Sequence, residues 1–157
     1  MSRNIEIRGI IKLKDCLTRS EYLIPDILEN NNTPSWDGFV ELYKNNDKNK
    51  KKSDMEARIP VQVKGETNLD ISSEQIKFNV NKSDLKNYLH NGGVIFFVVR
   101  MKDFDNHRIY YESLIPLKLK RYIKEMKNRN SMNIIFHTFP KDNIDEFTDI
   151  FLNFPMI

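Results

Sequence analysis

The chain has 157 residues, of which 39% are hydrophobic and 30% are charged. These values fit one soluble domain with its own core, and they exclude a wholly disordered chain. The 25 basic and 22 acidic residues leave a net charge of +3, which is too small to indicate nucleic-acid binding by itself.

The cysteine and histidine content excludes several kinds of site. A single cysteine, Cys16, rules out an internal disulfide and any zinc site built from several cysteines. The three histidines are scattered, and none stands four residues from another as in a helical metal pair. The N-terminus lacks a signal peptide, and the longest apolar run, Gly93–Val99, is too short to span a bilayer. We therefore expect a cytoplasmic protein with no membrane partner.

The first third of the chain predicts a helix, a strand and a loop. Isoleucines and leucines recur at helical spacing from Arg3 to Thr18. Gly9 weakens this helix by roughly 1 kcal/mol relative to alanine, or else it allows close packing. Glu21–Leu28 contains a strand, in which Pro25 indicates an edge position. Glu29–Ser35 is dense in turn-forming residues and is predicted to be a loop.

Two further strands are predicted on either side of a polar segment. They are Asp37–Tyr43 and Arg58–Gly65, and together they predict an antiparallel hairpin. In the second strand Val61 and Val63 face one way, whereas Gln62 and Lys64 face the other. The lysine-rich segment between the strands, Lys44–Ala57, can bury almost nothing, and we expect a solvated, mobile connection.

The second half of the chain alternates strands with helices. Val94–Met101 is apolar on both faces, which predicts a central buried strand. The other predicted strands are Leu69–Val80, Arg108–Leu114 and Ile134–Phe139. The other predicted helices are a short one capped by Ser83 and ended at Asn91–Gly93, a basic amphipathic one at Pro116–Arg129, and a last one at Asp142–Leu152 capped by Asp142 or Asn143. This order predicts an α/β fold, a mixed sheet with helices on both faces.

The C-terminal end carries much apolar surface, in Phe147, Ile150, Phe151, Phe154, Met156 and Ile157. We expect residues 1–157 to form a single domain. Two explanations of the apolar end remain open. The tail docks onto the domain, or the domain is the N-terminal part of a longer protein with a further C-terminal domain.

Three residues of the predicted hairpin form a candidate catalytic group. Asp37 opens the first strand, and Gln62 and Lys64 project from one face of the second. A hard cation such as Mg²⁺ or Mn²⁺ prefers oxygen ligands, which the Asp37 carboxylate, the Gln62 amide and the Val63 carbonyl can provide. Lys64 would then orient or deprotonate a water and screen a phosphate. Taken singly, Asp37 is equally a turn residue and the other two a solvated strand face; the combination favours a site.

The sequences PSWDG and RIPVQVKG carry a family resemblance. They resemble the D…(D/E/Q)xK core of the PD-(D/E)xK nuclease superfamily, which has the restriction-endonuclease-like fold. More narrowly, together with the later GGVIFFVV and IYYESLIPLKL, they are similar to the prokaryotic domain family of unknown function 4365. The similarity covers about residues 6–119. It implies a magnesium-dependent endonuclease domain that hydrolyses DNA phosphodiester bonds, in a prokaryotic defence or mobile-element context.

The resemblance also implies site roles. Such nucleases place a glutamate on the first helix, facing the metal, and Glu6 is the matching residue. The metal ligands would then be Glu6, Asp37, Gln62 and Val63, and the catalytic residues Asp37, Gln62 and Lys64. Gln62 stands where an acid is usual, which lowers the expected metal affinity. The alternative is therefore a catalytically silent module of the same fold that binds DNA or a protein.

Basic side chains form two candidate contacts to a nucleic-acid backbone. One is the lysine cluster Lys48, Lys50, Lys51 and Lys52; the other lies on the basic helix and includes Lys120, Arg121 and Lys124. Each is also readily explained as a solvated surface. The sequence does not separate DNA from RNA as the substrate. Nucleases of this fold commonly dimerise to cut both strands, so a homodimer is an expectation, although no interface pattern stands out.

Overall fold

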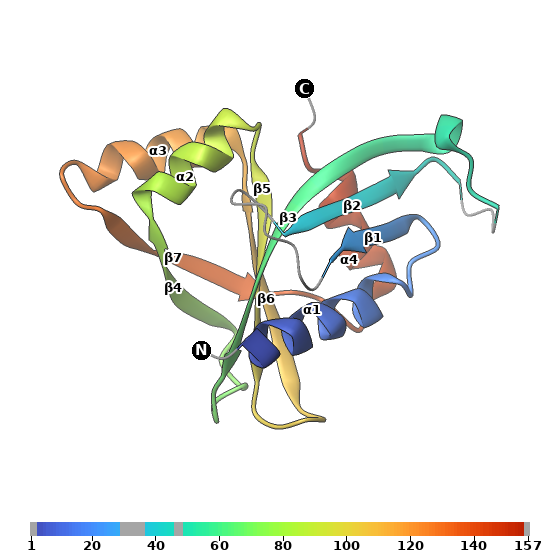
Figure 1. Cartoon of the computed structure of the whole chain (residues 1–157), viewed down its shortest axis with the longest axis horizontal. Coiled ribbons are helices and arrows are strands. Elements are labelled where there is room, and N and C mark those ends of the chain that lie inside the picture. Colours follow the sequence, from blue (N-terminus) through green and yellow to red (C-terminus); the bar gives the residue numbers. More distant parts are fainter. Residues whose placement is uncertain (1–2, 29–36, 46–48, 156–157) are drawn as a thin grey trace.

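The computed structural model describes residues 3–28, 37–45 and 49–155, and Figure 1 shows their arrangement. The helices are α1 (Arg3–Leu17), α2 (Lys82–His90), α3 (Pro116–Met126) and α4 (Ile144–Leu152), with a short 3₁₀ helix η1 (Lys52–Asp54). The strands are β1 (Leu23–Ile27), β2 (Gly38–Tyr43), β3 (Met55–Thr67), β4 (Gln75–Asn81), β5 (Val94–Met101), β6 (His107–Leu114) and β7 (Ser131–Thr138).

Across the described ranges the seven strands form one mixed sheet in the order β1-β2-β3-β5-β6-β7-β4. Only β3 and β5 pair in parallel; the other neighbours are antiparallel. The β6–β7 joint consists of two residue pairs, whereas β4 and β7 pair over seven. The predicted hairpin of β2 and β3 is confirmed, with Gly38 opposite Val61, and β1 lies at the sheet edge as Pro25 predicted.

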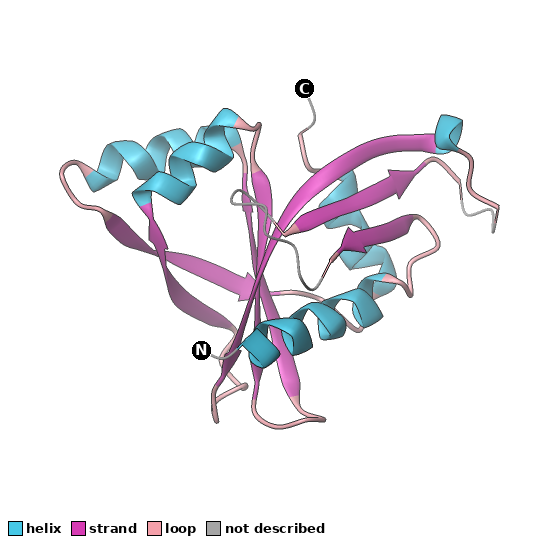
Figure 2. Cartoon of the chain, viewed as in Figure 1, coloured by secondary structure: helices cyan, strands magenta, loops and turns pink. Residues whose placement is uncertain are grey.

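Helices cover both faces of the sheet, which confirms the predicted α/β architecture (Figure 2). One face packs against α1 and α4, and the opposite face packs against α2 and α3. The central strand β5 contributes to both cores by alternation: Ile95, Phe97 and Val99 face α1 and α4, and Phe96 and Val98 face α2 and α3. All of these side chains are buried, as the uninterrupted apolar run predicted.

The helix α1 crosses β3 at a contact between two glycines. A Cβ added to Gly9 would lie 3.1 Å from the Cα of Gly65, and one added to Gly65 would lie 2.4 Å from the carbonyl oxygen of Ile5. Of the two explanations for Gly9, the structure therefore supports close packing. This contact fixes the first turns of α1 against the second half of β3.

The sequence misplaced several element boundaries. The strand β3 begins at Met55, inside the segment predicted to be a solvated connection, and η1 precedes it. Backbone pairing with β2 needs no apolar side chains, so polarity did not reveal the extension. The N-cap position of α2 is Asn81, not Ser83, and the Asn81 side chain makes no capping hydrogen bond. The helix α3 ends at Met126, before Lys127 with a φ of 53°. The strand predicted within Leu69–Val80 is limited to β4.

The last helix docks onto the sheet. Phe147, Phe151 and Phe154 are buried in the core that α4 shares with α1, and the Asn143 side chain caps the helix by accepting from the Glu146 N–H at 3.1 Å. Met156 and Ile157 lie outside the described residues. Among the helices that the structure describes, none has the length and apolarity needed to cross a membrane.

Candidate functional site

Asp37 lies directly before β2 and reaches across to β3. Its Oδ2 accepts a hydrogen bond from the Val63 backbone N–H at 2.7 Å and another from the Gln62 side-chain amide at 2.8 Å. The Asp37 backbone N–H donates to the Val61 carbonyl at 3.0 Å. Because the N–H and C=O of one strand residue point to the same edge of the strand, the Val63 carbonyl also faces Asp37. The hairpin thus brings these three predicted residues together.

Glu6, on the first turns of α1, and Lys64, the residue after Val63 on β3, complete the group. Since α1 is held against β3 at Gly65, its first turns lie over the end of the strand. The Lys64 Nζ lies 3.6 Å from the Glu6 Oε1, and the two side chains are 43% and 46% exposed. The residues predicted for catalysis or metal binding thus form two bonded groups at neighbouring positions of β3, which interact electrostatically. We call them together the Asp37 corner: Glu6, Asp37, Gln62, Val63 and Lys64.

The electrostatics of the corner disfavour a bare negative charge on Asp37. Burial raises the pKa of the Asp37 carboxyl and the nearby Glu6 carboxylate raises it further, while the hydrogen bond from Val63 and the positive charge of Lys64 oppose the shift. Gln62, only 8% exposed, adds no charge of its own. A cation placed between the two carboxylates would relieve this repulsion.

The donors of the corner fit a hard divalent cation. Glu6 and Asp37 provide carboxylates and the Val63 carbonyl provides a neutral oxygen, which are the ligand types that Mg²⁺ and Mn²⁺ prefer. Gln62 turns its amide N–H toward Asp37, so its oxygen could join the ligands only after the amide has flipped. Searching the described part of the chain finds no group of three or more histidine, cysteine, aspartate or glutamate side chains placed to hold a metal. Two carboxylates supplemented by carbonyl oxygens and waters suit magnesium, which rarely binds in an all-protein cage.

A pocket of about 290 Å³ opens beside the corner, between β3, β4 and α2. Gln62 and Lys64 line it from β3, and Asp84 and Tyr88 line it from α2. Sequence analysis missed the last two, because it treated α2 only as a short capped helix. The spacing of Asp84 and Tyr88, four residues apart on one helix face, was the available signal, but it did not reveal which strand that face covers.

The predicted nucleic-acid contacts lie apart from the corner. Lys51 and Lys52 are exposed beside η1, at the opposite end of the β2–β3 hairpin from Asp37 (Figure 1). Lys50 donates to the Asn45 carbonyl at 2.8 Å and lies over the Tyr43 ring. Lys48 lies outside the described residues. The same holds for Pro34, Ser35 and Trp36 of the PSWDG sequence. The three predicted contact residues of α3, Lys120, Arg121 and Lys124, are exposed, and α3 lies on the same face of the sheet as α2.

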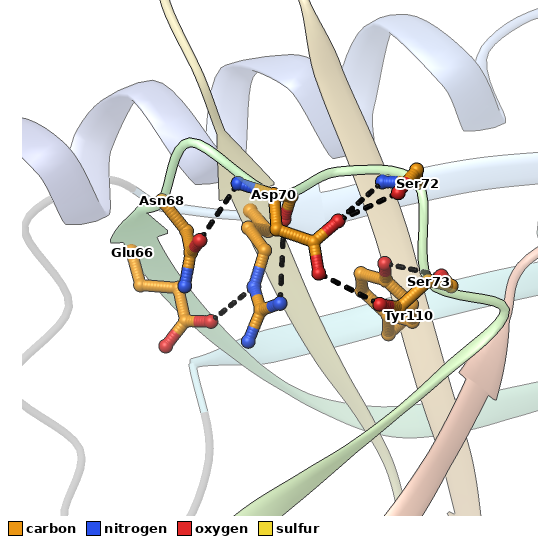
Figure 3. A network of polar contacts seen from close by, with 7 residues as sticks. Glu66, Asn68, Asp70, Ser72, Ser73 and Tyr110 are labelled. Carbon is orange, nitrogen blue, oxygen red and sulfur yellow. Dashed lines mark hydrogen bonds and ion pairs between the residues drawn. The ribbon is translucent and has the colours of Figure 1, made fainter.

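A second well-bonded carboxylate, Asp70, lies in the loop between β3 and β4 (Figure 3). It accepts hydrogen bonds from the N–H and hydroxyl of Ser72 at 2.9 and 2.8 Å and from the hydroxyl of Ser73 at 2.7 Å. The side-chain bond from Ser73, followed by those from Ser72, lowers the pKa of this exposed carboxyl. The Tyr110 hydroxyl donates to the Ser73 carbonyl at 2.6 Å. These contacts hold the loop in place.

Comparisons with known proteins give no further guidance on the site. A scan against protein-family models, a search of curated proteins and a search of solved structures each found no match to this chain.

Proposed function

We propose that the chain is a metal-dependent nuclease domain of the restriction-endonuclease-like type that hydrolyses DNA phosphodiester bonds. The observation that carries the proposal is the Asp37 corner, in which the Asp37 carboxylate accepts from the Gln62 amide and the Val63 N–H beside the Glu6–Lys64 ion pair. The resemblance of PSWDG and RIPVQVKG to the PD-(D/E)xK core, and with it to the domain family of unknown function 4365, supports the same assignment.

Each residue of the corner has a role in this reaction. Glu6 and Asp37 would hold Mg²⁺ or Mn²⁺, and the oxygens of Gln62 and Val63 would complete the protein ligands. A bound divalent cation provides Lewis acidity toward a phosphate oxygen and acidifies a water. The Lys64 ammonium donates hydrogen bonds to the attacking water or to the phosphate oxygens, where negative charge develops in the transition state.

Nicking of supercoiled plasmid DNA in Mg²⁺ tests the proposal. We expect the wild-type chain to nick the plasmid, and Asp37→Ala and Lys64→Ala to lose at least about 100-fold in rate, because each removes a group that acts on the reacting phosphate. Asp105→Ala and Lys102→Ala are matched controls on an exposed turn and should keep wild-type rates. Equal nicking by wild type and by both site variants would overturn the proposal.

The second candidate is a silent module of the same fold that binds DNA or a protein partner. Gln62 favours it, because a neutral amide in place of an acid weakens cation binding. Calorimetric titration with Mn²⁺ separates the two. Heat of binding that is lost in Asp37→Ala supports the nuclease, whereas DNA binding without any Mn²⁺ binding supports the silent module. Gln62→Glu puts the usual acid in place and should raise Mn²⁺ affinity about tenfold. Such a gain would identify Gln62 as the cause of weak metal binding.

A further inference from the structure

The pocket beside the Asp37 corner has an aromatic wall and a charged rim. The rings of Phe78 and Tyr88 pack against Phe96 with centroid separations of 5.7 and 6.2 Å. Gln62 and Lys64 border the pocket on the side of the corner, and Asp84 borders it on the side of α2. Its volume of about 290 Å³ lies at the lower end of the range for small-molecule sites, about 300–1,000 Å³. One planar ring system therefore suits it better than a larger ligand.

The polar groups of the pocket define which ring system fits. The Asp84 carboxylate offers two acceptor oxygens side by side and no donor. Burial, followed by the negative charges of Asp84 and Asp37, raises the pKa of the Tyr88 hydroxyl, so the phenol keeps its proton and acts as a donor. On its α2 side the pocket thus presents a pair of acceptors and one O–H donor; Gln62, Lys64, Asn79 and Asn81 provide the polar groups of the other sides.

Among nucleobases, guanine matches this set. Its Watson–Crick edge carries two adjacent donors, N1–H and N2–H, next to the acceptor O6. Thymine instead flanks its single N–H with two carbonyl oxygens, which a carboxylate repels. Enzymes that bind an unstacked base read this edge by hydrogen bonds and hold the ring against aromatic or apolar side chains. Only an unpaired base can enter, because stacking and pairing hide the edge in a duplex.

We propose that the pocket binds an unpaired guanine of the substrate strand beside the scissile phosphate, with Asp84 accepting from N1–H and N2–H and Tyr88 donating to O6. This inference rests on the proposed nuclease function, because Gln62 and Lys64 belong both to the corner and to the pocket wall. It makes the protein a nuclease for single-stranded or locally opened DNA with a preference for guanine at one position.

Fluorescence anisotropy with the whole chain in EDTA tests base binding without cleavage. Three labelled single strands of eleven nucleotides are compared: eleven thymidines, and the same strand with guanine or hypoxanthine at the centre. Hypoxanthine lacks only the N2 amino group. We expect the guanine strand to bind about tenfold more tightly than the other two, as is typical of a hydrogen bond to a charged group.

Two variants identify the residues responsible. Asp84→Asn replaces one acceptor with a donor and should reduce the ratio of guanine-strand to thymidine-strand affinity from about ten to about one. Tyr88→Phe keeps the ring packing and should reduce the guanine preference about threefold. Asp105→Asn, on an exposed turn, should leave all three affinities at wild-type values.

Equal affinity of the wild type for the three strands, or an equal loss on all three in Asp84→Asn, would overturn the guanine pocket. The plasmid assay reports separately on the nuclease. Nicking without guanine preference would remove the pocket and keep the nuclease, whereas guanine preference without nicking would keep the pocket as a nucleic-acid site and remove the nuclease.

Discussion

Asp37 and Asp70 lie on either side of the second half of β3 and accept similar hydrogen bonds. Asp37 takes one from a backbone N–H and one from a side-chain amide, and Asp70 takes one from a backbone N–H and two from serine hydroxyls. Their pKa values nevertheless shift in opposite directions, up for Asp37 because of burial and down for Asp70 because of its hydrogen bonds.

The difference shows that the number of hydrogen bonds does not by itself set the direction of a carboxyl pKa. Asp70 stays in water, so every bond from its own loop stabilises the charged form. Asp37 has lost water, and this desolvation outweighs the hydrogen bond from Val63 and the positive charge of Lys64, which both favour the charged form.

Asparagine substitutions give the sharpest test of this comparison. Asp37→Asn should reduce plasmid nicking and Mn²⁺ binding by at least about 100-fold, because it removes a charged ligand while preserving shape. Asp70→Asn should change both by less than about twofold, since its side chain bonds only within the loop. Nicking rates and calorimetric titrations measured on both variants check this. Similar losses in the two would show that the corner has no special role.

Gly65→Ala tests whether the corner depends on the α1 contact. The added methyl group would lie 2.4 Å from the Ile5 carbonyl, and we expect a loss of about 2 kcal/mol in the free energy of unfolding. Because α1 carries Glu6, nicking should fall as well. Gly9→Ala is the milder partner, with a closest approach of 3.1 Å. Urea denaturation gives the free energies; an unchanged value for Gly65→Ala would contradict the packing.

The smallest effects are expected in the pH dependence of stability, in which the variants of the two aspartates should change in opposite directions. A raised folded-state pKa means that the stability contributed by Asp37 is present below its unfolded pKa and lost as pH rises through the folded value. At pH 7, Asp37→Asn should therefore raise the free energy of unfolding, on the order of 1 kcal/mol, and the gain should vanish in acid. The side-chain oxygen of the Asp37→Asn variant can accept both hydrogen bonds that the Asp37 Oδ2 accepts, from the Gln62 amide and the Val63 N–H.

Asp70 should show the opposite sign. Its lowered pKa provides stability above the unfolded pKa that is lost as pH falls through the folded value, so Asp70→Asn should lower the melting temperature at pH 7 and converge on wild type in acid. Thermal melts of both variants and wild type from about pH 7 to about pH 2 check the two signs together. The gain of Asp37→Asn should shrink as its carboxyl takes up a proton, whereas the loss of Asp70→Asn should begin to shrink only below the ordinary pKa of an aspartate. Parallel curves for the two variants would contradict the pKa directions.

Sequence alone predicted the parts of this molecule that repeat with a short period. The alternation of Val61 and Val63 with Gln62 and Lys64 fixed both the strand and the face that carries the polar pair, and the apolar run of β5 predicted its central position. The meeting of Asp37 with Val63 followed once the two strands were paired. These inferences need only neighbouring elements of the chain.

What the sequence did not predict depends on contacts between distant elements or on backbone pairing alone. Asp84 and Tyr88 line the pocket because α2 packs over β3 and β4, and no periodicity within the helix reveals that placement. The polar start of β3 at Met55 pairs with β2 through its backbone. Lys51 and Lys52 were grouped with the nucleic-acid contacts by charge, but the length of the hairpin carries them to its far end.

The edge of β3 that faces Asp37 also has a consequence for aggregation. Beyond Val61, no strand within the described ranges pairs with this edge, and an open edge invites pairing with the strand of another molecule. The Asp37 carboxylate already takes the Val63 N–H, and the Glu6–Lys64 ion pair lies at the end of the same edge. Substitutions that remove these charges would leave a strand edge to which another molecule could add a strand. The same side chains would therefore also oppose aggregation.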